Sequence, residues 1–524
     1  MRPLPVTALV ALLVVPALAR AQATPPRADL LIRAGTVIDG TGAPARTADV
    51  AITGERITFV GDARRANVQA AREIDARGLI VAPGFIDPHT HTYADLQSDR
   101  VERRTNAAYL MQGVTTVVTG NDGGGPVDVA DHLQRWEARG IGTNAALFVG
   151  LGTVRGKVLG MSDAKATTDQ LALMKVMVAK GMDEGALGLS TGLYYAPQSY
   201  ATTEEVIALA REAASRGGVY DSHLRDESSY TVGLLGAVRE ILRIGTEAGL
   251  PVHIAHIKAL GVDVWGQSDS VIAVVRRARA QGQRVTADQY PYTASGTGLG
   301  AALLPRWAEA GGNDSLRARI RNPEYRDRLV ADMQNNLRRR GGAASLLITG
   351  GRDRALVGKT LEEIARSRNA DPILTALEIL MSGGAGVASF NMNEDDIAAF
   401  MREPWVFTGS DGSDGHPRKY GTYPRKLRRY VMERKVITLE QMVQRSSRDV
   451  ATALGIDERG SLQVGQLADV IVFDTAQVAE RATFEEPERL AEGMQYVLVN
   501  GTLAVSEGKL TGALPGRGVR RARK

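Results

Sequence analysis

The chain has 524 residues, of which 44% are apolar and 23% are charged. This composition is typical of a globular protein that is long enough for a large domain and an accessory one. The formal net charge of +5 is concentrated at the ends, because two cations lie in the first 23 residues and five lie in the last eight. The other 57 basic residues (64 minus these seven) face 59 acidic ones, so the near-neutral body is unlike that of a nucleic-acid-binding protein. Disulfides and thiolate metal ligands are excluded, because the chain has no cysteine.

The first 23 residues are predicted to be a signal peptide. Arg2 supplies a positive start, residues 6–19 are mostly apolar, and two Ala-x-Ala cleavage sites follow. A secreted chain without cysteine suits the bacterial periplasm, which we predict as its location. No other stretch approaches the roughly 18 uninterrupted apolar residues of a spanning helix, so we expect no membrane span.

Short β-type runs are frequent near both ends of the chain. Residues 28–82 include a hairpin pattern, in which Gly54-Glu55 separates two apolar segments. Similar runs return in residues 455–510. We therefore predict a small β-sandwich domain built from both termini, with a central domain of residues 83–454 between its two parts. Residues 511–524 are predicted to be a basic tail, whose charge run 517–524 is expected to be a disordered, solvated end rather than an anchor on an anionic surface.

The central domain alternates short apolar runs with helical patterns. Eight runs are predicted to be buried parallel strands: 79–86, 114–119, 144–150, 186–190, 218–223, 251–256, 284–288 and 405–409. Such alternation favours an α/β fold of the (β/α)₈ TIM-like barrel type over an open sheet. About 115 residues separate the last two strands. We interpret residues 299–400 in this gap as an insertion that serves as a lid.

The first of these runs leads into Pro-His-Thr-His, which places His89 and His91 one residue apart. In an extended strand these two side chains point to the same side, so both can bind one metal ion. Other predicted strands also end near histidines or acidic residues: Asp122, Asp221, His223, His253, His256 and Asp411. Barrel enzymes carry their active sites at these strand ends, so the pattern predicts a metal centre there with histidine and carboxylate ligands.

Several sequence motifs surround these residues. They are Pro83-Gly-Phe-Ile-Asp-Pro-His-Thr-His91, Gly113-Val-Thr-Thr-Val-Val-Thr-Gly-Asn121, Ser190-Thr-Gly-Leu-Tyr-Tyr195, His223-Leu-Arg-Asp-Glu227, His256-Ile-Lys258, Tyr290-Pro-Tyr-Thr-Ala294 and Phe407-Thr-Gly-Ser-Asp-Gly412. Together they resemble the N-acyl-D-amino-acid deacylases (D-aminoacylases) of the amidohydrolase superfamily. The resemblance covers roughly residues 28–510.

The resemblance implies a zinc-dependent enzyme that holds one or two Zn²⁺ ions. By this resemblance, one ion is bound by His89, His91 and His256, and the other by His223. Asp411 would be the catalytic carboxylate, which accepts a proton from water and delivers it to the leaving amine nitrogen. Asp414 is the alternative, because the run Gly-Ser-Asp-Gly-Ser-Asp-Gly offers two similar acids.

Asp122 marks a departure from the family pattern. The family carries a cysteine metal ligand after the second strand, and this chain has Asp122 at that position. A carboxylate can bridge two metal ions, so we predict that Asp122 replaces the thiolate as a ligand. The alternative is that Asp122 is a turn residue beside a mononuclear site. Many other amidohydrolases carry a carboxylated lysine at the end of the fourth strand. This chain has no lysine at that position, and Lys157, after the third strand, is only a weak substitute.

Candidate substrate-binding residues follow the same motifs. Lys258 lies two residues beyond His256 and suits a substrate carboxylate, as does Arg418. Tyr195 and Tyr290 match tyrosines of the family motifs and could hydrogen-bond the substrate. Arg225 is a further cation near the cavity mouth. The alternatives are that the tyrosines pack at the barrel rim and that Arg225 and Arg418 pair with Asp226, Glu227 or Asp414.

The sequence thus predicts a zinc-dependent hydrolase that cleaves the amide bond of N-acyl-D-amino acids. Enzymatic alternatives are a peptidase for D-amino-acid or isoaspartyl-containing peptides and a cyclic-amide hydrolase. A non-catalytic metal-binding protein that retains the barrel and binds ligands is the alternative from another class. The expected partner is a small-molecule N-acyl amino acid or peptide, with no nucleic acid and no membrane span. The sequence leaves the oligomeric state open, with a homo-oligomer among the options.

Overall fold

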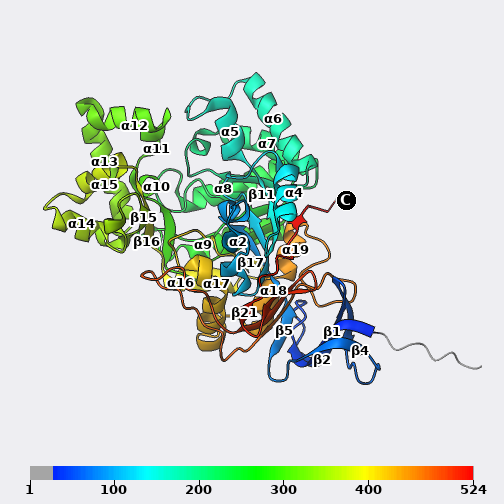
Figure 1. The fold of residues 1–524 in the computed structure, drawn as a ribbon. Helices are drawn as coiled ribbons and strands as arrows, with labels where there is room; N and C mark the ends of the chain where they lie inside the picture. Colours follow the sequence, from blue (N-terminus) through cyan, green and yellow to red (C-terminus); the bar gives the residue numbers. More distant parts are fainter. Residues whose placement is uncertain (1–26, 523–524) are drawn as a thin grey trace, which may run out of the picture.

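The structure is a computed structural model that describes residues 27–522. The predicted signal peptide, residues 1–23, lies outside this range. In the described part of the chain, strands and connecting helices form a central body, and a separate group of helices projects from one side (Figure 1). None of the helices within residues 27–522 is both long and apolar enough to cross a membrane.

Strands from both ends of the chain share one nine-stranded sheet. Their order is β21-β20-β19-β18-β5-β1-β2-β3, and β4 also pairs with β1. The N-terminal strands are β1 (Arg27–Val37), β2 (Arg46–Thr53), β3 (Arg56–Gly61), β4 (Gln69–Asp75) and β5 (Ile80–Pro83), and the C-terminal strands are β18 (Val470–Phe473), β19 (Met494–Val499), β20 (Thr502–Ser506) and β21 (Lys509–Leu510). The two sets meet where β5 pairs antiparallel with β18. The predicted hairpin is confirmed, since Gly54 and Glu55 connect β2 to β3 and Gly54 has a positive φ of 56°.

The central strands are parallel and form two arcs. One arc has the order β22-β8-β7-β6, and the other has the order β17-β13-β12-β11-β10-β9. Their bounds are β6 (Phe85–Thr90), β7 (Val114–Thr119), β8 (Asn144–Leu147), β9 (Val149–Gly150), β10 (Gly188–Gly192), β11 (Val219–His223), β12 (Val252–Ile254), β13 (Val285–Gln289), β17 (Val406–Thr408) and β22 (Gly518–Val519). A parallel bridge between Thr90 and Gly412 links the first arc to the segment that follows β17.

The first predicted central strand is divided in the structure. The predicted run 79–86 contains β5 of the terminal sheet and the beginning of β6, with Gly84 between them. A side chain at Gly84 would place its Cβ 2.2 Å from Oγ1 of Thr115, so only glycine allows the chain to pass there. As a result, β6 extends further than predicted and includes His89.

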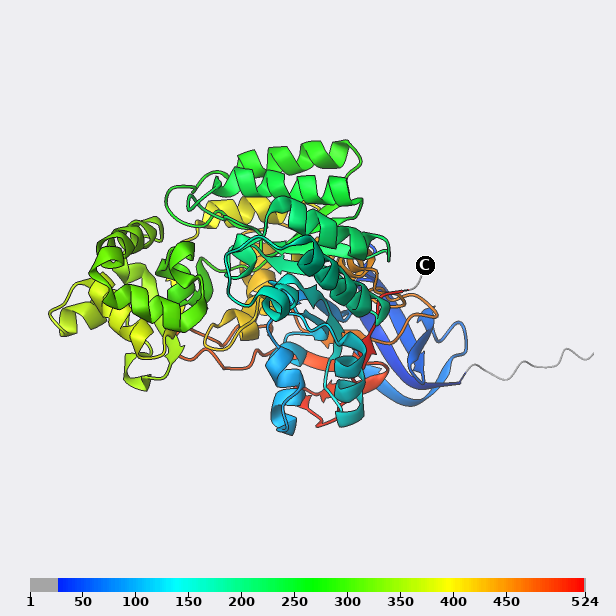
Figure 2. The same cartoon turned by 90° about the horizontal axis from the view of Figure 1, so that it is seen from above.

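Helices follow most central strands and surround them (Figure 2). They are α1 (Tyr93–Leu96), α2 (Val101–Arg104), α3 (Ala107–Leu110), α4 (Val129–Arg139), α5 (Leu151–Leu159), α6 (Thr168–Asp183), α7 (Thr203–Ala214), α8 (Gly233–Ala248), α9 (Ser268–Ala280), α16 (Glu394–Arg402), α17 (Arg418–Arg425), α18 (Leu439–Arg445) and α19 (Arg448–Leu454), with a π-helix at Lys426–Glu433. Thr202 caps the start of α7, because its hydroxyl accepts a hydrogen bond from the Glu205 amide.

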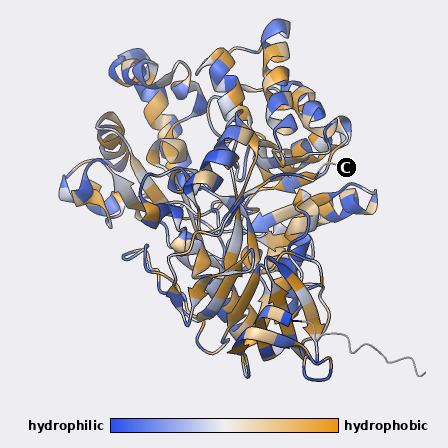
Figure 3. Cartoon of the chain, turned by 45° about the vertical axis from the view of Figure 1, so that its right-hand side comes forward, coloured by the Kyte–Doolittle hydropathy of each residue, from blue (hydrophilic) through white to orange (hydrophobic). Residues whose placement is uncertain are grey.

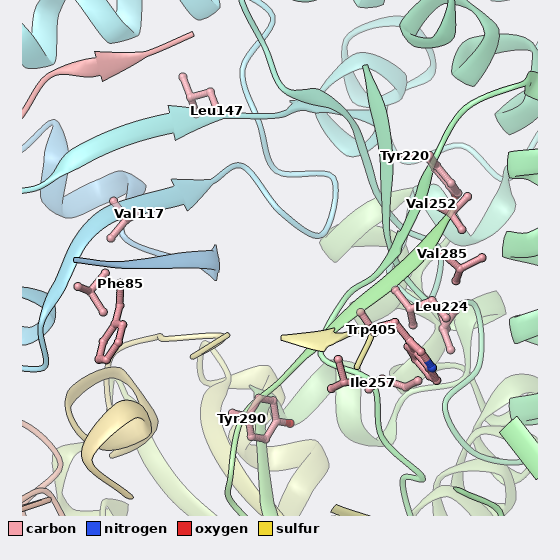
Figure 4. Packing of buried hydrophobic residues seen from close by; sticks show 14 of the residues in the cluster. Phe85, Val117, Leu147, Tyr220, Leu224, Val252, Ile257, Val285, Tyr290 and Trp405 are labelled. Atoms are coloured by element: carbon pink, nitrogen blue, oxygen red, sulfur yellow. The ribbon is translucent and has the colours of Figure 1, made fainter. Parts of the chain in front are cut away.

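Alternate residues of the central strands contribute to two different hydrophobic clusters. The larger cluster includes residues of both arcs, and Figure 4 shows among them Phe85, Val117, Leu147, Tyr220, Val252 and Val285. The next residues along β6 and β7, Ile86 and Val118, belong to a second cluster that also contains Val450 and Leu454 of α19. This alternation follows from the two-residue period of a strand, and it packs both faces of the arcs. Figure 3 shows the apolar strands and the mixed polar and apolar helices around them.

The C-terminal segment is ordered through residue 522, so the prediction of a disordered basic end is wrong for residues 517–522. Gly518 and Val519 form β22, which pairs parallel with β8. The side chain of Val519 is buried in the second hydrophobic cluster, and Arg517 forms an ion pair with Glu55. The sequence did not reveal this role, because Val519 is the only large apolar residue in the basic run 517–524.

The insertion before β17 has a hydrophobic core of its own. It contains a three-stranded antiparallel sheet of β14 (Ala294–Gly298), β16 (Ala385–Phe390) and β15 (Leu346–Gly351), in that order. Its helices are α10 (Leu299–Leu303), α11 (Arg306–Glu309), α12 (Gly312–Arg321), α13 (Pro323–Arg339), α14 (Leu361–Ser367) and α15 (Pro372–Met381). These helices form the lobe that projects from the central body in Figures 1 and 2. The insertion therefore spans 294–390 rather than 299–400, because α16 packs against α9 of the central body.

Replacing Val519 by alanine should lower the unfolding temperature, because the side chain is only 8% exposed. The expected loss of unfolding free energy is about 1–3 kcal/mol. Thermal unfolding followed by circular dichroism measures this change. Val464→Ala is the matched control, because Val464 is 65% exposed and should tolerate the same substitution. Equal unfolding temperatures for the two variants would contradict a structural role for β22.

Candidate metal centre and active site

The predicted metal ligands converge at the carboxyl ends of the central strands. His89 lies in β6 and His91 follows it, while Asp122 lies in the turn after β7. His223 is the last residue of β11. His256 and Asp411 follow β12 and β17 by two and three residues. Since parallel strands end at the same edge, residues as far apart along the chain as His89 and Asp411 meet in one site.

These side chains form two groups that share Asp122. The first group contains His89, His91, Asp122 and Asp411, and the second contains Asp122, His223 and His256. Within each group the candidate ligand atoms lie within 4.8 Å of one another. This differs from the arrangement that the resemblance implied, because His256 lies with His223, at 2.9 Å between Nε2 and Nδ1, rather than in the group of His89 and His91.

The spacing of the ligand atoms fits a tetrahedral ion. Two ligands that each lie about 2.0–2.1 Å from zinc are separated by roughly 3.4 Å in tetrahedral geometry. Asp122 Oδ1 lies 3.6 Å from His89 Nε2 and 3.4 Å from His256 Nε2, and Asp122 Oδ2 lies 3.6 Å from His91 Nε2. The buried atoms His89 Nε2 and Asp122 Oδ1 have no hydrogen-bond partner in the structure. Buried polar atoms require partners, so this donor set fits a bound cation such as zinc.

Three of these residues adopt a backbone conformation that is unusual for residues other than glycine. Asp122, His256 and Asp411 have φ values of 54°, 34° and 48°. Such conformations cost about 1–3 kcal/mol each and are common at functional sites. Each is fixed by a hydrogen bond to its backbone: Gln198 Nε2 to Asp122 O at 2.9 Å, His256 N to Asp288 Oδ1 at 3.0 Å, and Asp411 N to His89 O at 2.9 Å.

Two buried carboxylates, which the sequence analysis missed as site residues, contact the outer nitrogens of the histidines. Glu227 lies 3.5 Å from His223 Nε2 and 3.2 Å from His256 Nδ1. Asp288 lies 3.7 Å from His89 Nδ1 and 3.1 Å from His253 Nε2. Carboxylates in such positions orient metal-binding histidines. Asp288 could have been found as the acid near the end of the seventh strand, whereas Glu227 lies in a loop without a strand-end position.

Asp411 and Asp414 have different surroundings, although the sequence made them similar candidates. Asp411 is buried, and it lies 3.0 Å from His91 Nε2 and 2.7 Å from Arg418 Nη1. Burial raises the pKa of Asp411, but Arg418 and the histidines outweigh that effect and lower it below its usual value. Asp414 is 59% exposed in its side chain and pairs with Arg103 and Lys419. The structure therefore favours Asp411 as the acid that faces the metal ligands.

A cavity of about 540 Å³ opens above the two groups. Four predicted substrate-binding residues line it: Tyr195, Lys258, Tyr290 and Arg418. Arg225 does not line it and instead pairs with Glu240 at 2.8 Å. The ring of Tyr290 lies between two cations, 4.7 Å from Arg418 Cζ and 5.8 Å from Lys258 Nζ. Residues of the insertion complete the wall, including Thr297, Ala301, Arg340, Thr349 and Val387.

Lys258 is engaged more closely by the protein than the sequence suggested. Its ammonium donates to Glu227 Oε1 at 2.5 Å and lies 2.7 Å from His256 Nδ1. A free cation for the substrate was expected at this position. Lys258 instead stabilises the charge of Glu227 behind the metal ligands, while it still lines the cavity.

The other candidates lie outside the two ligand groups. His253 contacts Thr286 and Asp288 below the ligands. His132 of α4, which was not a candidate, also lies outside them, and its ring contacts the Tyr93 hydroxyl at 2.9 Å. Lys157 is exposed on α5, so the structure gives no support for a carboxylated lysine there.

Replacing Asp122 by alanine should reduce the metal content of the purified protein, because both ligand groups lose their shared carboxylate. If the wild-type centre holds two zinc ions, we expect the variant to lose at least one of them. Inductively coupled plasma mass spectrometry measures the zinc content of both proteins. Asp122→Cys should retain more zinc, because a thiolate is also a zinc ligand. Asp414→Ala is the matched control, because its side chain is 59% exposed and paired with cations. An unchanged zinc content in Asp122→Ala would reject the ligand role.

Comparison with known proteins agrees with this geometry. Residues 72–505 match the amidohydrolase family. D-aminoacylase of Alcaligenes xylosoxydans xylosoxydans is 34% identical over 517 residues, which cover 93% of this chain and 97% of that relative. A crystal structure of D-aminoacylase has a TM-score of 0.81 and 34% identity, and it covers 94% of this chain and 100% of that one.

A second solved structure is that of N-acyl-D-glutamate deacylase from Bordetella bronchiseptica, complexed with zinc and a phosphonate inhibitor. It has a TM-score of 0.81 and 33% identity, and it covers 94% of this chain and 100% of that one. These similarities extend over nearly the whole described chain and show an α/β fold of the TIM-barrel type that amidohydrolases have. This chain belongs to the amidohydrolase family.

Proposed function

We propose that this protein is a zinc-dependent hydrolase of the amide bond in N-acyl-D-amino acids. The observation that carries the proposal is the pair of histidine and carboxylate groups that share Asp122 at the floor of one cavity. Relatives that are 33–34% identical over most of the chain are a D-aminoacylase and an N-acyl-D-glutamate deacylase. The family match supports a metal-dependent amide hydrolase in the same way.

The ligands would hold one or two zinc ions, with His89, His91 and Asp122 at one position and Asp122, His223 and His256 at the other. When bound, zinc supplies a Lewis acid for the amide carbonyl and lowers the pKa of water. Asp411 lies beside the first position as a carboxylate, so it can accept the proton of the attacking water. The same group then donates that proton to the amine nitrogen as the amide bond breaks.

Cations and hydroxyl groups of the cavity wall would orient the substrate. Arg418 presents a planar guanidinium and can bind the α-carboxylate of an amino acid with two hydrogen bonds. Tyr290 stacks against that guanidinium and fixes its plane. Arg418 lies 2.7 Å from Asp411, so a substrate carboxylate held there lies next to the proton-transferring group.

Several finer features belong to the same proposal. We infer that the two parallel arcs form one (β/α)₈ barrel, and that the terminal strands form a β-sandwich domain beside it. We also propose export to the periplasm and leave a homo-oligomer open to measurement. A substrate panel would reveal activity on cyclic amides or on D-peptides, so these two alternatives are not separate proposals. The non-catalytic alternative is disfavoured, because Asp411 is buried beside the metal ligands.

Replacing Asp411 by asparagine should abolish most turnover of N-acetyl-D-methionine while zinc content is retained. The amide is nearly isosteric but cannot accept the proton, so kcat should fall by roughly 10²–10⁴-fold. Amine release measured by a ninhydrin assay gives kcat, and mass spectrometry gives zinc content. Asp414→Asn is the control and should keep its activity. Zinc-loaded wild-type protein that hydrolyses no N-acyl-D-amino acid would refute the proposal.

A further inference from the structure

Arg340 brings a buried positive charge from the insertion to the substrate cavity. It directly follows α13, and its side chain is 2% exposed. The backbone before it is tied to the central body, because Val262 N donates to Arg339 O at 3.2 Å. Arg340 lines the same cavity as Asp122, His223 and Arg418. The insertion thus places a third cation in a cavity that already contains Lys258 and Arg418.

Within residues 27–522, no carboxylate lies within ion-pair distance of Arg340. Its partners are neutral: it donates to Ala302 O at 3.1 Å and lies 3.5 Å from the Tyr194 hydroxyl. The Asn391 amide, turned so that its oxygen faces the guanidinium, accepts a third hydrogen bond at 3.2 Å. Three other buried arginines do have acid partners: Arg155 pairs with Glu205, Arg418 with Asp411 and Arg459 with Asp469.

An unpaired buried guanidinium is costly, because arginine cannot lose its proton at physiological pH and a buried charge needs a counter-ion. Lys258 and Arg418 already have Glu227 and Asp411 as partners. Arg340 has no such partner, so the cavity presents one net positive position away from the metal ligands. An anionic group of a bound substrate would supply the missing negative charge.

Tyr230 provides a second polar group at this position. Its hydroxyl is buried and has no hydrogen-bond partner, and its ring lies 5.9 Å from Arg340 Cζ. Burial raises the pKa of Tyr230 above its usual value, so the hydroxyl keeps its proton and can donate it in a hydrogen bond. Tyr230 also lines the cavity. A guanidinium beside a free phenol is a suitable pair of donors for a carboxylate.

Tyr194 connects this position to the metal centre. Its ring stacks on that of His223 with a centroid distance of 5.8 Å, and its hydroxyl lies next to Arg340. One tyrosine ring therefore separates the Arg340 guanidinium from a metal ligand. A substrate whose amide carbonyl lies at the metal ligands can reach Arg340 with a short side chain or acyl group.

We propose that Arg340 and Tyr230 bind a second carboxylate of the substrate, so that the enzyme prefers N-acyl-D-amino acids with two carboxylates. This inference rests on the proposed function and narrows its substrate class. The second carboxylate belongs either to the amino-acid side chain or to the acyl group, and both present the same chemistry to Arg340. The α-carboxylate remains at Arg418.

The test compares each dicarboxylate with a neutral substrate of similar size. N-acetyl-D-glutamate against N-acetyl-D-glutamine probes a side-chain carboxylate, and N-succinyl-D-alanine against N-butyryl-D-alanine probes an acyl carboxylate. Wild-type enzyme should show a higher kcat/KM for the dicarboxylate in one of these pairs. In Arg340→Met that ratio should fall by roughly 10–100-fold, because charge-assisted hydrogen bonds are lost. Arg340→Lys should recover part of the ratio, since it restores the charge.

Two further variants keep the test decisive. Tyr230→Phe removes one hydroxyl and should lower the same ratio by a smaller factor, which covers the case in which Arg340→Met fails to fold. Arg338→Met removes a neighbouring guanidinium that is 58% exposed and paired with Asp263, so the ratio should not change.

The outcomes separate this inference from the proposed function. Equal kcat/KM values within both pairs for the wild-type enzyme would overturn the role of Arg340 and leave the proposed function intact. A proportional loss on charged and neutral substrates in Arg340→Met would likewise overturn it, because that result indicates a structural role. Failure to hydrolyse any of the four substrates or N-acetyl-D-methionine would refute the proposed function itself.

Discussion

The carboxylate of Asp122 faces four histidine side chains, and the geometry of the site depends on this contact. Its oxygens lie 3.4–3.8 Å from nitrogens of His89, His91, His223 and His256. A carboxylate has two oxygens that can each bind a different ion, so one residue can join both ligand groups. The close approach of its loop requires Gly192, where a Cβ would lie 2.5 Å from Asp122 O.

The acids behind the histidines complete the charge balance. Burial raises the pKa of Glu227, but His223, Lys258 and His256 outweigh that effect and hold the pKa low. Asp288 behaves in the same way beside His253 and His89. Ionised acids at the outer nitrogens favour the tautomers that leave the inner nitrogens free for a metal. The same acids compensate for the positive charge that zinc brings into a buried region.

The sequence predicted the parts of the site that follow from strand geometry. His89, Asp122, His223, His256 and Asp411 lie at or just beyond strand ends, and a parallel arrangement brings such residues together whatever their separation along the chain. The α/β architecture followed from the alternation of apolar runs and helical patterns.

Features that depend on three-dimensional packing could not be predicted. The grouping of His256 with His223 depends on side-chain directions that strand ends leave open. Glu227 lies in a loop, and Arg340 directly follows a helix. No sequence periodicity fixes the direction of either side chain. Val519 is the single large apolar residue of the basic run 517–524, so composition favoured disorder, although its buried side chain and the pairing of β22 with β8 hold the segment in place.

The chemistry and the substrate preference come from different parts of the chain. The ends of the central strands and the turns that directly follow them supply every predicted metal ligand, and pairing along the two arcs fixes the positions of these strands. The insertion supplies Arg340 and much of the outer cavity wall, and it packs around a hydrophobic core of its own. A substitution in that wall leaves the strand ends in place, so substrate preference can change while the metal centre is retained. Burying the Arg340 charge without a counter-ion costs folding free energy. That cost does not disturb the metal centre under this division, and it is offset when a substrate with a matching negative charge binds.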